Sequence, residues 1–87
     1  MLGNKTIVKV KFKDLGRDNA NFTTKETTWK EVTEGNFLYN HAKAHLMSND
    51  IDFMVEKENQ FAGRVVVGGF RTVGEFEVII VEEVDNG

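Results

Sequence analysis

The chain has no cysteine and no proline. Without cysteine, neither a disulfide framework nor a thiolate zinc site can stabilise the fold. No apolar run reaches the roughly 18 residues that a membrane-spanning helix needs, and residues 1–13 alternate in polarity instead of forming the apolar segment of a signal peptide. These absences favour a single soluble domain, 1–87, with no membrane association. We expect it to be cytoplasmic, because a reducing compartment suits a chain without disulfides.

Positive charge is also scarce. Eleven lysines and arginines stand against 14 aspartates and glutamates, so the formal net charge is −3. Bulk binding to duplex nucleic acid needs a strongly basic surface, which makes nucleic acid a less favoured partner. Apolar residues, in contrast, make up 40% of the chain and include seven phenylalanines. That is enough for one packed core in a chain of this length.

Alternating polarity predicts several strands. In residues 5–13, Val8, Val10 and Phe12 fall on one face of a strand. Lys9, Lys11 and Lys13 fall on the other face. Four more strands are expected at 22–27, 51–57, 63–67 with an extension towards 72, and 74–83. The last three should form an antiparallel meander, in which Gly68 and Gly69 indicate a bulge or a hairpin turn.

One helix is expected between the second and third strands. Residues 28–31 (Thr-Trp-Lys-Glu) have the form of a capping box, which predicts a helix start at Trp29. Gly35 interrupts the pattern, so a start at Asn36 is the alternative. The helix should end at residues 48–50, and its apolar stripe comprises Trp29, Val32, Tyr39, Ala42 and Leu46. The sequence therefore predicts an α+β fold in ββαβββ order, with one helix on a four- to five-stranded, mainly antiparallel sheet.

The last strand carries apolar side chains on both faces, because residues 78–81 read Val-Ile-Ile-Val. A single helix covers only one face of a sheet, so the other face should keep an apolar patch with a charged rim. The alternative is that the sheet curls, or that the 14–21 loop folds over the patch. The candidate binding face consists of Ile7, Lys9, Lys11, Glu75, Glu77, Ile79 and Val81.

No motif indicates catalysis. Ser48 is the only serine and has no evident base near it in sequence. His41 and His45 are four residues apart, a spacing that can grip a metal ion on one helix face. However, Ala42 stands where a zinc protease helix carries its glutamate, and no third ligand is identifiable. We expect no enzyme activity, no metal and no cofactor.

A basic strip formed by Lys9, Lys11, Lys13 and Arg17 is the alternative binding site. It could follow a phosphate backbone, although no aromatic side chain shares its face to stack on bases. Glutamates on a neighbouring strand would explain the lysines equally well. A nucleic-acid or nucleotide-binding, ligand-sequestering domain is therefore the second functional hypothesis.

In its length, its lack of cysteine and proline, and its richness in Asn, Lys, Glu and Thr, the chain resembles small orphan proteins of bacteriophages and mobile elements. The resemblance is compositional. It implies a non-enzymatic protein-binding module that inhibits a host protein or defence complex by occupancy, either as a monomer or as a homodimer.

Overall fold

The structure is a computed structural model that describes residues 3–47, 49–59, 61–69 and 71–84 of the chain. Within these described residues, six strands and two helices follow one another in the order βββααβββ. The N-terminal half holds β1 (Ile7–Leu15), β2 (Ala20–Thr23), β3 (Thr27–Thr28), α1 (Trp29–Thr33) and α2 (Phe37–Lys43); the C-terminal half holds β4 (Ile51–Val55), β5 (Ala62–Val67) and β6 (Arg71–Glu82).

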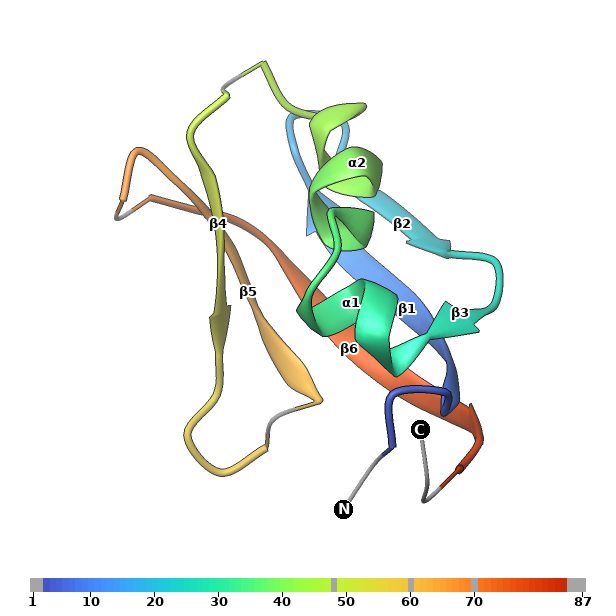
Figure 1. Cartoon of the computed structure of the whole chain (residues 1–87). Helices are drawn as coiled ribbons and strands as arrows, with labels where there is room; N and C mark the ends of the chain where they lie inside the picture. Colours follow the sequence, from blue (N-terminus) through green and yellow to red (C-terminus); the bar gives the residue numbers. More distant parts are fainter. Residues whose placement is uncertain (1–2, 48, 60, 70, 85–87) are drawn as a thin grey trace.

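All strands belong to one antiparallel sheet with the order β2-β1-β6-β5-β4, and β3 also pairs with β1 (Figure 1). The predicted meander of the last three strands is confirmed. Gly68 and Gly69, with φ of 63° and 85°, lie in the hairpin that joins β5 to β6. The long strand β6 returns beside β1, so the first and last strands form the centre of the sheet.

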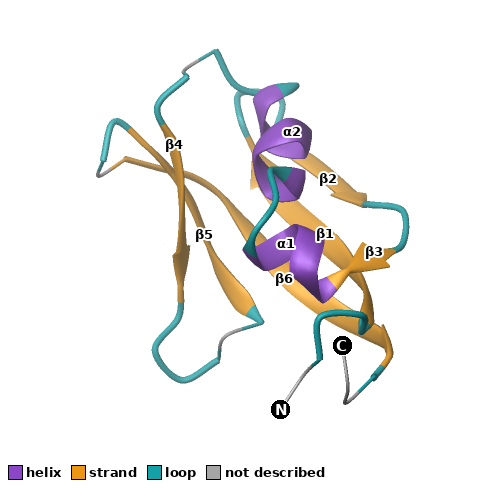
Figure 2. Ribbon diagram, in the orientation of Figure 1, coloured by secondary structure: helices purple, strands orange, loops and turns teal. Residues whose placement is uncertain are grey.

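The predicted single helix is wrong in detail, because two short helices replace it (Figure 2). The first begins as the capping box predicts, with the Thr28 hydroxyl accepting a hydrogen bond from the Glu31 amide at 3.3 Å. Gly35 and Asn36 then separate the helices, as expected for residues with poor helix propensity. The second helix ends at Lys43, before the predicted end at residues 48–50, of which Ser48 lies outside the described residues.

The predicted number of strands and the ββαβββ order are also corrected. The second predicted strand, 22–27, is split into β2 and β3 by residues 24–26. Thr24 bridges this interruption, since its amide donates to the Val10 carbonyl at 2.8 Å and its hydroxyl accepts from the Val10 amide at 3.0 Å. The backbone of β1 therefore stays hydrogen-bonded at Val10, between the segments that pair with β2 and β3.

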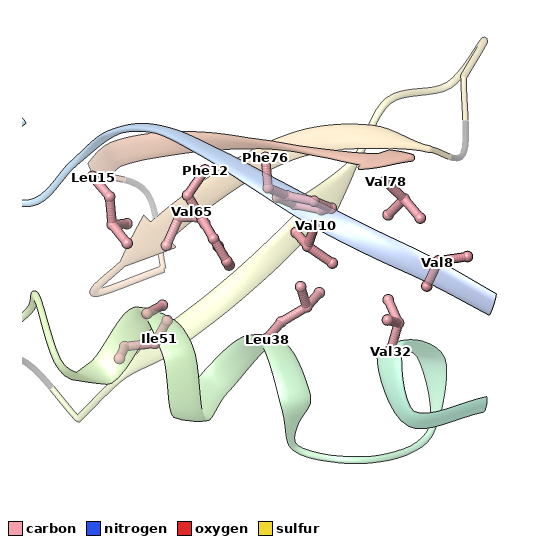
Figure 3. Close-up of a cluster of buried hydrophobic side chains, with 11 residues drawn as sticks. Val8, Val10, Phe12, Leu15, Val32, Leu38, Ile51, Val65, Phe76 and Val78 are labelled. Atoms are coloured by element: carbon pink, nitrogen blue, oxygen red, sulfur yellow. The ribbon is translucent and has the colours of Figure 1, made fainter. Parts of the chain in front are cut away.

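The core lies between one face of the sheet and the two helices (Figure 3). Val8, Val10 and Phe12 of β1 point towards the helices, as their alternation predicts, and all three are fully buried. Phe76 and Val78 of β6 lie beside them, and Val32 and Leu38 face them from the helices. Both helices thus cover the same face of the sheet.

Candidate functional site

The face of the sheet away from the helices, called the outer face below, carries the predicted binding residues of β1 and β6. Lys9 lies opposite Ile79, and Lys11 lies opposite Glu77. Because cross-strand partners share a face, these side chains project together on the side opposite Val10 and Val78. Lys11, Glu75 and Glu77 are exposed there.

The charges on this face alternate in sign across the strands. Lys13 of β1 lies opposite Glu75 of β6, which in turn lies opposite Arg64 of β5. Lys11 lies opposite Glu77 in the same way. Such opposite-charge neighbours each contribute roughly 0.2–1 kcal/mol to strand pairing. Two of the three lysines of the predicted basic strip, Lys11 and Lys13, therefore face carboxylates, which lowers the positive potential that a phosphate backbone would meet.

One end of the outer face is apolar. Ile79 is 38% exposed and Val81 is 46% exposed, so neither a loop nor curling of the sheet encloses them. The strand register shifts here: Val8 pairs with Ile80, but Ile7 pairs with Glu82, which leaves Val81 as the additional residue of β6. We call Ile7, Ile79 and Val81 the outer patch.

Val66 of β5 belongs to the same face, because it alternates with Val65 of the core cluster. It pairs with Asp52 of β4 and Thr72 of β6. It is only 2% exposed, yet it is not part of the main core cluster. The outer patch is thus limited to the end of the face where β6 extends past its ladder with β5 and pairs with β1, which here also pairs with β3.

Arg17 lies apart from the three lysines, in the turn that follows β1. Together with Arg71 and His45 it lines a cavity of about 710 Å³ that also contains Asp14 and Asp18. Gly16 in this turn lies against the backbone carbonyl of His45, so the turn packs beyond the end of α2 and not over the outer patch. The carboxylates of the two aspartates offset the guanidinium groups of the two arginines. The lining of the cavity therefore carries charges of both signs.

The two histidines have different surroundings. His41 lies on α2, where its Nδ1 is 2.9 Å from the Phe37 carbonyl oxygen and its ring packs on the Phe37 ring. His45 lies beyond the end of α2, with its ring centroid 5.0 Å from that of Phe22. Among the described residues, no group of three or more His, Cys, Asp and Glu side chains could hold a metal ion.

No family model, no curated protein and no solved structure matches this chain. Within the part of the chain that the structure describes, no helix is long and apolar enough to cross a membrane.

The sequence did not indicate one exposed apolar region, which lies on β4. Alternation places Phe53 and Val55 on the same face as the buried Ile51, but Val55 is 54% exposed, and Met54 on the other face is 48% exposed. The reason is that β4 is an edge strand, paired only with β5 among the described strands. The three consecutive apolar residues Phe53, Met54 and Val55 were the available signal. Such a short run does not reveal whether a strand lies at the edge or in the centre.

Proposed function

We propose that this chain is a non-enzymatic protein-binding module that inhibits its partner by occupancy and docks through the outer face of its sheet. The observation that supports the proposal is the exposure of Ile79 and Val81 on a face that neither helix covers. An apolar centre with a charged rim is a common layout for protein interfaces. The compositional resemblance to phage and mobile-element proteins favours a host enzyme or defence complex in the cytoplasm as the partner.

The energetics require the rim to take part. Fully burying an aliphatic side chain contributes about 1.5–3 kcal/mol, so covering the exposed two fifths of Ile79 or Val81 contributes about 1 kcal/mol each. A stable interface buries roughly 800 Å² on each partner, far more than two side chains provide. The partner must therefore also contact Lys9, Lys11, Glu75 and Glu77, whose mixed charges would select a surface with the opposite arrangement.

The chain offers a matched pair of variants for the test. Ile79 and Ile80 are adjacent, identical in type and equally exposed at 38%, but their side chains alternate between the two faces of β6. Ile79→Lys should weaken partner binding at least tenfold, whereas Ile80→Lys should leave it within about twofold; both variants are compared by calorimetry with the partner captured from the native host. Equal effects of the two substitutions would remove the outer patch as the site.

Two further outcomes would redirect the proposal. Sedimentation over a wide concentration range distinguishes a homodimer, which Ile79→Lys should dissociate, from a module that binds only a different protein. Binding of a single-stranded oligonucleotide that falls steeply with rising salt would instead support the basic-strip hypothesis. We expect no such binding, because Lys11 and Lys13 lie opposite Glu77 and Glu75.

A further inference from the structure

A second surface lies on the helix side of the sheet, at the free edge of β4. An apolar groove of about 470 Å³ runs between this strand and the two helices. Its walls include Trp29 of α1, Tyr39 of α2, and Phe53 and Val55 of β4. None of these residues belongs to the outer patch, so the groove is independent of the face discussed above.

The hydrogen bonds at the two ends of β4 show which backbone groups point outward. Gly68 donates to the Asp50 carbonyl at 3.1 Å, and Glu56 donates to the Ala62 carbonyl at 3.0 Å. In an antiparallel pair, alternate residues direct both backbone groups to the same neighbour. The even-numbered residues of β4 therefore bond to β5, and the N–H and C=O groups of Ile51, Phe53 and Val55 point away from the sheet.

The same three residues thus present two features together. Their backbone groups form a row of donors and acceptors along the open edge, and their side chains line the groove. An added strand could bond to this edge while its own alternate side chains enter the groove. Main-chain bonding combined with side-chain pockets is the arrangement by which extended peptides extend a sheet.

The acidic residues near the edge of β4 indicate which kind of added strand would bind there. Asp52 of β4 and Glu56, the residue after β4, alternate in sequence with Phe53 and Val55 and flank Met54. Asp52 also borders the groove. A second copy of β4 fits poorly as the added strand, because each symmetric antiparallel register opposes like charges. A pair centred on Asp52 places the two Asp52 side chains opposite each other. A pair centred on Phe53 places Asp50 opposite Glu56, and a pair centred on Met54 places Asp52 opposite Glu56. Like charges directly opposite one another destabilise strand pairing. Basic residues at those positions of the added strand would instead be attracted.

We infer that the edge of β4 is a strand-addition site for an extended segment of a partner protein in which apolar and basic residues alternate. The apolar side chains of that segment enter the groove beside Phe53 and Val55, and its lysines or arginines lie opposite Asp52 and Glu56. The segment adds a further strand to the sheet next to β4.

The probe for this inference is a synthetic peptide with the sequence of residues 7–13, Ile-Val-Lys-Val-Lys-Phe-Lys, which has the required alternation. Its control replaces each lysine by glutamate. The protein should bind the basic peptide at least tenfold more tightly than the acidic one, as measured by fluorescence anisotropy. Failure to bind the basic peptide, or equal binding of the two peptides, would overturn the inference.

Two variants separate the groove from the opposite face of the same strand. Val55→Glu places a charge in the groove and should weaken basic-peptide binding at least tenfold, whereas Met54→Glu adds the same charge beside Asp52 and should maintain or strengthen it. Amide exchange of Phe53 and Val55 should slow on binding. Equal effects of the two variants, or binding without slower exchange at these amides, would contradict strand addition. Ile79→Lys should bind the peptide like the unaltered protein, so this test does not depend on the outer patch.

Discussion

Replacing Thr24 by valine tests how the sheet tolerates the break between β2 and β3. The substitution keeps the shape of the side chain but removes the hydroxyl that accepts the Val10 amide at 3.0 Å and donates to the Lys25 carbonyl at 2.9 Å. Val10 is fully buried, so water cannot replace the lost acceptor. Lys25 is exposed, and water can hydrate its carbonyl oxygen.

The magnitude follows from the buried donor. Leaving one buried N–H without a partner costs about 1–3 kcal/mol, and in a domain of this size 1 kcal/mol corresponds to roughly 4–8 °C in melting temperature. We therefore expect Thr24→Val to lower the free energy of unfolding by about 2 kcal/mol. In urea denaturation the midpoint should fall without a change in slope.

The neighbouring Thr23 supplies the control, because it is exposed and lies opposite Lys11 on the outer face. Thr23→Val should change stability by less than about 0.5 kcal/mol. Amide exchange of Val10 should accelerate only in the Thr24 variant. Equal loss in the two variants, or unchanged exchange at Val10, would refute the role assigned to the Thr24 hydroxyl.

Two further substitutions test local features of the fold. Thr28→Ala should destabilise the protein by about 1 kcal/mol through loss of the cap on α1, and Thr28→Ser should restore most of that stability in thermal melts followed by circular dichroism. Gly16→Ala should cost clearly more than Gly68→Ala, although both glycines have positive φ, because a methyl group at Gly16 meets the His45 carbonyl whereas the space around Gly68 is open. Similar melting temperatures for the two glycine variants would contradict the close packing of the β1–β2 turn.

The features that depend on local sequence were the most predictable. Alternation around Val10 identified β1 and its buried face, and the Thr28 capping box located the start of α1. Gly35 was recognised as an interruption, but its effect depends on tertiary packing: Leu38, which was not assigned to the apolar stripe, is buried because α2 is a separate helix. Local propensity alone could not specify which face of α2 is buried.

The candidate sites depend on long-range pairing. Lys11 and Glu77 share a cross-strand position because β6 returns beside β1, and no local pattern fixes that neighbour. Patterning did indicate that Ile79 would face away from the core. Patterning could not show that β4 lies at the edge, where Val55 is exposed although it alternates in phase with the buried Ile51.

In the proposed complex, the partner covers the outer patch. Lys11 on the outer face and Lys30 on α1 are both exposed in the free chain, so their rates of acetylation report on the two sides of the molecule. In the complex with the captured partner, we predict that acetylation of Lys11 slows at least tenfold while that of Lys30 is unchanged. Protection of Lys30 with Lys11 still fully reactive would contradict the proposal.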